Sequence, residues 1–238
     1  MSRVALVGLL GLGSIFCFAL LAAKAEPEKT SVDVPEKLQP FAKQMLEIAK
    51  TYPNYGRVDD EFRWAPWLCR MPNPGQTRFT ASKDADTHGG RKLYSVFAKD
   101  REAYHLLSFA QKPPAEVASG QIIVKESWLP EEIKSSEIPV PVQQRRKLAN
   151  GFEVFESFQP YVQRDGKVYK ASKIAGLFIM MKTDPKNPDT DKGWIYGMVS
   201  ADLKQVTGVG KIESCMECHG KAPHDRLFGL PNQFAPAK

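Results

Sequence analysis

The sequence predicts an α+β fold in which a mainly antiparallel β-sheet carries a few flanking helices. Four short segments are rich in β-branched and aromatic residues and are bounded by turn formers, as strands are: residues 92–98, 120–128, 175–182 and 193–201. Two further segments have the apolar spacing of a helix, residues 35–52 and 100–110. Hairpin-type turns rather than helical crossovers connect the strands, which favours antiparallel pairing.

The first helix is expected over residues 35–52. Pro35 lies near its start, and Pro53 ends it because proline has no amide hydrogen to continue the helical hydrogen bonds. Its apolar positions recur at steps of three and four residues: Leu38, Phe41, Met45, Ile48 and Ala49. Residues 53–90 follow as a long ordered loop held by aromatic anchors.

The rest of the chain is expected to form one domain. Residues 130–150 carry three prolines and many charges, which predicts a surface excursion. Residues 163–167 (Gln-Arg-Asp-Gly-Lys) predict a hairpin turn. Since no internal repeat is seen, the expected organisation is a leader over residues 1–25, a helix and loop region over residues 26–90, and a folded domain over residues 91–238.

The first 25 residues have the form of an export signal. Arg3 precedes an almost wholly apolar run, and Ala23-Lys24-Ala25 has the small-x-small pattern of a cleavage site. We expect cleavage and a periplasmic or otherwise exported protein without a membrane span; an uncleaved anchor is the alternative, because the run approaches spanning length. Cleavage removes two basic residues and lowers the formal charge from +6 to +4. No basic run exceeds three residues, so no nucleic-acid partner is expected.

The chain has four cysteines, too few for a disulfide-scaffolded domain. Two of them lie in Cys215-Met216-Glu217-Cys218-His219, a CxxCH sequence, which is the attachment signature of c-type haem. Two thiols at this spacing can add to the two vinyl groups of one porphyrin, and the adjacent His219 can then be the proximal ligand of the iron. The sequence therefore predicts one covalently attached haem c near the C-terminus.

Two other interpretations fit the motif less well. A thioredoxin-type disulfide between Cys215 and Cys218 would be expected near a βαβ unit, which the sequence does not show. A structural zinc site that also recruits His224 would more commonly take its ligands from two separated pairs. The remaining cysteines are Cys17, inside the signal, and Cys69, which is either a buried thiol or one half of an intermolecular disulfide.

Three stretches, in their order along the chain, resemble a known family. They are residues 119–126 (SGQIIVKE), residues 193–197 (GWIYG) and residues 214–219, which hold the haem signature. Over residues 91–230 the chain is similar to the cytochrome P-460 family, which includes the cytochromes c′-beta. The resemblance implies a homodimer, a five-coordinate haem iron, and an open distal side that takes small nitrogen species such as hydroxylamine or nitric oxide. A member that oxidises its substrate also needs an electron acceptor, which we expect to be another cytochrome.

The resemblance also implies a role for Lys125. In cytochrome P-460 a lysine is joined covalently to the porphyrin rim, and by its place in the GxxxxKE segment that lysine looks like Lys125 here. Strand alternation independently puts Ile122, Val124 and Trp128 on one face and Lys125 on the other. A solvent-facing Lys125 without a function is the alternative.

One departure separates the chain from the hydroxylamine-oxidising members. Those members place a distal carboxylate on the strand before the Gly-Trp stretch, whereas residues 177–181 here read Leu-Phe-Ile-Met-Met. Without that acid, rapid hydroxylamine oxidation is less expected, and Phe178 is either part of an apolar distal pocket of the c′-beta type or plain core. A third interpretation is an electron carrier in which Met180, Met181, Met198 or His224 is a sixth ligand. Whether the chain is an enzyme stays open.

Overall fold

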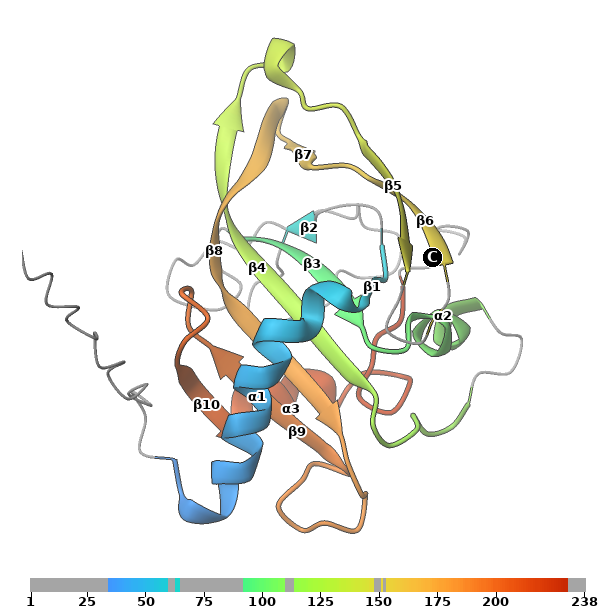
Figure 1. The fold of residues 1–238 in the computed structure, drawn as a ribbon, viewed down its shortest axis with the longest axis vertical. Coiled ribbons are helices and arrows are strands. Elements are labelled where there is room, and N and C mark those ends of the chain that lie inside the picture. Colours follow the sequence, from blue (N-terminus) through green and yellow to red (C-terminus); the bar gives the residue numbers. More distant parts are fainter. Residues whose placement is uncertain are drawn as a thin grey trace, which may run out of the picture.

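A computed structural model describes residues 34–59, 63–64, 92–109, 114–147, 151 and 153–230. In this part of the chain, an eight-stranded sheet and a separate two-stranded sheet are flanked by three α-helices (Figure 1). Every strand pairing among these residues is antiparallel. The fold is therefore α+β with a mainly antiparallel sheet and few helices, as the sequence predicts.

The large sheet has the order β1-β3-β4-β8-β9-β10, with β2 beside β3 and β7 beside β8. Its strands are β1 Gly56–Arg57, β2 Arg63–Trp64, β3 Leu93–Ala98, β4 Ile122–Ile133, β7 Tyr161–Arg164, β8 Lys167–Lys182, β9 Trp194–Val199 and β10 Val206–Gly210. The two longest strands, β4 and β8, pair along the whole of β4, from Ile122 opposite Met181 to Ile133 opposite Val168. The other strands are added on either side of this central pair.

Helix α1, Gln39–Thr51, covers one face of the sheet (Figure 1). It lies between two 3₁₀ turns, and Pro53 is in the second of them, where the predicted helix ends. Its apolar stripe is buried: Ala42, Met45, Ile48 and Ala49. The helix approaches β9 closely at Gly197, which has no side chain. A Cβ atom at this position would overlap the sulfur of Met45 on the helix.

Helices α2, Arg101–Phe109, and α3, Glu213–His219, belong to the other face. A second apolar cluster joins α2, the sheet and the segment after α3: Tyr104, Leu107, Ile123, Met180, Trp194, Tyr196 and Leu227. Alternation along β4 separates the two layers, because Val124 packs with the α1 side and Ile123 with the α3 side. The sheet is thus covered by apolar side chains on both faces.

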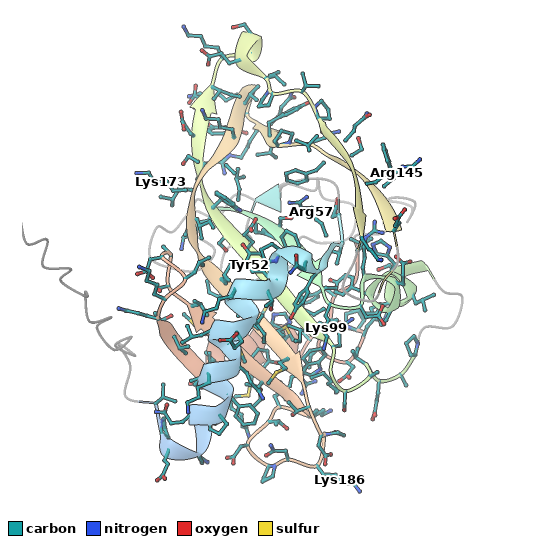
Figure 2. All side chains as sticks on the ribbon, in the orientation of Figure 1. Tyr52, Arg57, Lys99, Arg145, Lys173 and Lys186 are labelled. Carbon is teal, nitrogen blue, oxygen red and sulfur yellow. The ribbon has the colours of Figure 1, made fainter. Side chains whose placement is uncertain are left out.

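The described side chains from residue 130 to residue 147 are half-buried or exposed, which agrees with the predicted surface excursion, but the strands within it were not predicted. Strand β4 continues to Ile133, and β5, Val142–Lys147, pairs with β6, Glu153–Phe158, in the small sheet (Figure 1). The described side chains of β5, such as that of Arg145 (labelled in Figure 2), are exposed, and no alternating apolar pattern marks this strand in the sequence. Strand β10 was likewise not predicted, because it is short and holds two glycines.

The predicted hairpin turn over residues 163–167 is confirmed. Arg164 pairs with Lys167, and both Asp165 (φ 52°) and Gly166 (φ 73°) have the left-handed backbone that a type I′ turn requires.

The described part of the predicted loop over residues 53–90 adds the short strands β1 and β2 to the edge strand β3. The expected signal over residues 1–25 and all of residues 65–91, with the leftover Cys69, lie outside the described residues. Among the residues that are described, no helix is both long and apolar enough to cross a membrane.

Candidate functional site

A cavity that is partly open to solvent lies against the α3 face of the sheet. The sheet contributes lining residues from β3, β4, β8 and β9, and the rest of the wall comes from the residues after β1, from α2, from α3 and from the segment that follows α3. Most of the lining side chains are apolar or aromatic, including Val96, Tyr104, Ile123, Met180 and Phe228.

Helix α3 brings the CxxCH residues into this wall. Cys215, Cys218 and His219 stand at i, i+3 and i+4, positions that share one side of a helix, and all three line the cavity. The helix ends at Gly220, whose amide donates a 2.7 Å hydrogen bond to the carbonyl of Met216. The motif was predicted from sequence, whereas the helix that turns its residues to one side was not.

His219 is held by one backbone hydrogen bond. Its Nδ1 lies 2.7 Å from the carbonyl oxygen of Arg226, and because a carbonyl can only accept, Nδ1 carries the proton and Nε2 the lone pair. Burial lowers the pKa of His219, partly opposed by the bond to Arg226 and reinforced by the charge of Lys125. Burial thus favours the neutral imidazole with its lone pair on Nε2, the form that binds a metal ion.

Arg226 is itself fixed by an ion pair with Asp191. The guanidinium donates two hydrogen bonds to the carboxylate, from Nε to Oδ2 at 2.8 Å and from Nη2 to Oδ1 at 2.7 Å. The hydroxyl of Tyr196 donates a third, 2.8 Å long, to Oδ2 of Asp191. These bonds hold the pKa of Asp191 below its ordinary value, with the bonds from Arg226 as the largest cause.

A second ion pair, between Lys182 and Asp225, anchors the segment that follows α3. Lys182 and Asp225 have side chains only 3% and 8% exposed, and Nζ of Lys182 lies 2.7 Å from Oδ2 of Asp225. Lys182 also donates to the carbonyl of Lys192, and Asp225 accepts from the amide of Val117. The segment after α3 is thus tied to β8 and to the loop before β4.

Lys125 lies in the cavity wall on β4. Its ammonium is 4.9 Å from the ring centroid of Tyr94 and 5.4 Å from that of Phe178. The neighbouring Glu126 lies on the opposite face of the sheet, where it accepts hydrogen bonds from Tyr52 (labelled in Figure 2) and from Trp128. The alternation expected for this strand is therefore present, and Lys125 is half-buried in the cavity wall rather than on an open surface.

Phe178 lies directly opposite Lys125 in the β4–β8 register and also lines the cavity. Of the three methionines considered as sixth ligands, Met180 lines the cavity, whereas Met181 packs in the α1-side core and Met198 lies near Gly208. What any of them does toward a cofactor stays a prediction.

One cavity residue was missed by sequence reasoning. Asp59 follows β1 and is the carboxylate-bearing residue among the described cavity-lining residues. The strand over residues 177–181 holds no acid, and the carboxylate in the cavity wall comes instead from the residues after β1. Its sequence context of short, irregular elements gave no signal that it would reach the cavity.

The two other interpretations of the motif find little support. Cys215 and Cys218 are both thiols and are not joined by a disulfide, and the described strands form no parallel βαβ unit. Within the described ranges, no three His, Cys, Asp or Glu side chains gather where they could hold a metal ion, and His224 is in no such group. It pairs instead with Leu227 in a short backbone bridge.

The donor set fits a c-type haem. Two thiols and one basic imidazole nitrogen lie in the wall of one largely apolar cavity, and a porphyrin brings four nitrogen ligands of its own, so a single imidazole is enough. Comparison of the chain with models of known protein families and with curated proteins finds no match.

Proposed function

We propose that this chain is an exported mono-haem c-type cytochrome of the cytochrome P-460 type, which binds or oxidises a small nitrogen species at an open haem site. One observation carries the proposal. Cys215, Cys218 and His219 line one largely apolar cavity, and the bond from Nδ1 of His219 to Arg226 leaves Nε2 as the basic nitrogen.

Three residues would hold the haem. The thiols of Cys215 and Cys218 would form thioether bonds to its vinyl groups, and Nε2 of His219 would bind its iron. When bound, the haem supplies a redox-active iron that can take a small ligand. Covalent attachment suits a cavity that is partly open to solvent, because the cofactor then stays in place without being fully enclosed.

Lys125 would take part through its amine. The rings of Tyr94 and Phe178 lie within 5.4 Å of the ammonium and limit where it can move, which supports a fixed position in the wall. By the resemblance, this amine is the group joined to the porphyrin rim.

Asp59 supports an enzymatic role. Oxidation of hydroxylamine releases protons, and a carboxylate in the cavity wall can accept them. The apolar remainder of the wall, with Val96, Phe178 and Met180, equally suits the uncharged ligand nitric oxide, so a binding protein of the c′-beta type is the alternative.

A second candidate function is electron transfer with a closed iron. It is favoured by one observation, the presence of the Met180 side chain in the cavity wall. A thioether bound as sixth ligand would raise the reduction potential and exclude external ligands.

The proposal includes two protein partners, a second copy of the chain and an electron-accepting cytochrome. Large apolar side chains are exposed around the small sheet and the end of β4, which supports an interface there: Leu129, Val140, Val142 and Phe155. Of these, Val140 is 82% and Phe155 62% exposed.

The test is expression of the full chain together with a c-type cytochrome maturation system. We expect one covalent haem per chain by mass spectrometry, an absorption spectrum of a five-coordinate iron, and binding of carbon monoxide by the ferrous protein. The variants Cys215→Ala and Cys218→Ala should each lose a thioether bond, whereas Ser214→Ala should load haem normally.

The outcomes separate the candidates. A chain that carries no covalent haem contradicts the whole proposal. A six-coordinate ferrous protein that refuses carbon monoxide favours the electron carrier, and Met180→Ala should then restore carbon monoxide binding. An open iron without hydroxylamine turnover favours the nitric oxide-binding alternative.

A further inference from the structure

We propose that Asp191 and Arg226 form a clamp that positions His219 and thereby sets how strongly its Nε2 donates to the iron. The inference rests on the proposed function, because it concerns the strength of an iron ligand. Neither residue lines the cavity, so both are positioning residues rather than catalytic ones.

The clamp acts through the side chain and the backbone carbonyl of Arg226. The side chain of Arg226 is bound to Asp191 by two hydrogen bonds of 2.7 and 2.8 Å, in a bidentate geometry that restricts both distance and orientation. The backbone carbonyl of Arg226 accepts the Nδ1 proton of His219 at 2.7 Å. Holding the guanidinium therefore also holds the carbonyl that orients the imidazole.

The backbone at this point needs such a restraint. Asp225 (φ 48°) and Arg226 (φ 71°) both lie in the left-handed region, which residues other than glycine rarely adopt. They are the central residues of a tight turn closed by hydrogen bonds between His224 and Leu227, of 2.9 and 3.1 Å. Two ion pairs connect this turn to the rest of the fold: Asp225 binds Lys182 on β8, and Arg226, whose carbonyl accepts from His219, binds Asp191.

Asp191 is itself held in place at the start of β9. Its backbone pairs with Trp194 at the start of β9 through hydrogen bonds of 2.9 and 3.0 Å. Its carboxylate also accepts a hydrogen bond from Tyr196, whose ring lies 5.8 Å from that of His219. The ion pair is largely buried, with side chains 16% exposed for Arg226 and 12% for Asp191, so water competes little with it.

The physical consequence follows from the hydrogen bond at Nδ1. A firm bond from Nδ1–H to a carbonyl raises the basicity of the imidazole and fixes the orientation of the ring, as partners of metal-binding histidines generally do. A more basic Nε2 stabilises the oxidised iron. Loosening the clamp should therefore weaken the iron–histidine bond and raise the reduction potential.

Because the two residues carry opposite charges, variants of each can separate the effect of the clamp from a purely electrostatic effect on the reduction potential. Arg226→Ala removes a positive charge and Asp191→Ala removes a negative one, so a purely electrostatic effect would shift the potential in opposite directions. The clamp predicts a shift in the same direction, toward easier reduction. We expect each variant to raise the equilibrium constant for reduction roughly two- to tenfold, the range for loss of one hydrogen bond.

The experiment uses the haem-loaded full chain with three readouts: the iron–histidine stretching frequency of the ferrous protein by resonance Raman spectroscopy, the reduction potential, and thermal unfolding. Both single variants should lower the stretching frequency, and the double variant should lower it no further than either, because the pair acts as one unit. Asp225→Asn is the matched control, since it breaks a comparably buried ion pair in the same turn. It should lower the unfolding temperature without changing the stretching frequency.

Three results would overturn the clamp while leaving the proposed function intact. They are unchanged frequency and potential in a haem-loaded protein, opposite shifts of the potential in the two single variants, and an equal frequency shift in Asp225→Asn. Failure of the proposed function is recognised separately, by the absence of covalent haem in the unmodified chain.

Discussion

Lys125 and Phe178 lie opposite each other on β4 and β8, and both side chains face the cavity that contains His219. The ammonium of Lys125 is 5.4 Å from the ring centroid of Phe178. Directly opposed residues of antiparallel strands share a face of the sheet. Lys125 and Phe178 therefore both lie in the cavity wall, whereas the preceding residue on β4, Val124, packs in the core on the α1 side. Four predictions follow from the placement of residues around this sheet.

The first concerns the amine of Lys125. Lys125→Arg and Lys125→Ala should both abolish a porphyrin adduct that survives chemical cleavage of the thioether bonds, because neither side chain offers a primary amine. Mass spectrometry of the peptides measures the adduct.

The exposed Lys173 on β8 provides the control for this experiment, and Lys173→Ala should leave the adduct unchanged. An unmodified chain without any adduct at Lys125 would contradict the crosslink, and an unchanged spectrum in Lys125→Ala would count against the enzymatic function.

The second prediction concerns Asp59. If its carboxylate accepts protons from hydroxylamine, Asp59→Asn should lower kcat for hydroxylamine oxidation by about a hundredfold, the lower end of the range for loss of a general base. Nitric oxide binding to the ferrous protein should change little, since it needs no proton acceptor. Asp202→Asn, on the exposed turn before β10, serves as the control, and equal activity in both variants would exclude this role for Asp59.

The third prediction is a pH dependence of stability. Arg226 holds the pKa of Asp191 below its ordinary value of 3.8, so the folded protein binds this proton more weakly than the unfolded chain does. The stabilisation is therefore fully present above the ordinary pKa and is lost as the pH falls through that value and below it. Asp191→Asn should lower the free energy of unfolding by about 2 kcal/mol at pH 7, a value between those of exposed and buried pairs.

Urea unfolding between pH 7 and pH 2 measures this effect, and the difference between the two proteins should shrink below about pH 4. Glu132→Gln, which removes an exposed partner of Lys167, is the control and should change the stability little at any pH. A difference for Asp191→Asn that stays constant down to pH 2 would show that the ion pair is not its cause.

The fourth prediction tests the packing of α1. Gly197→Ala should destabilise the protein by about 1–3 kcal/mol, because the added Cβ would overlap the sulfur of Met45 in a filled core. Gly208→Ala is a matched control in the adjacent strand: its nearest neighbour would be the end of the flexible Ile212 side chain at 3.3 Å, which can move. Equal losses of stability in urea would contradict the close approach of α1 to β9.

Some features of the molecule could be predicted from sequence because they depend on local periodicity. The helix of α1 follows from the spacing of Met45 and Ile48, and the hairpin turn follows from Asp165-Gly166. The side of β4 on which Lys125 lies follows from a period of two. The spacing of Cys215, Cys218 and His219 is likewise a local feature, and the haem c that it indicates stays a prediction.

The remaining features depend on contacts between distant parts of the chain. The pairing of β5 with β6 joins polar segments that no apolar pattern distinguishes. Asp59 reaches the cavity because β1 pairs with β3, and the bond from His219 to Arg226 is maintained by Asp191, which lies 35 residues earlier. The sequence by itself determined the first helix, the hairpin turn, the four apolar strands and the haem-attachment signature, since these are set by residues within a few positions of one another. Only the tertiary structure decided which carboxylate enters the cavity and which ion pair orients the histidine, because those contacts form only when the whole sheet has assembled.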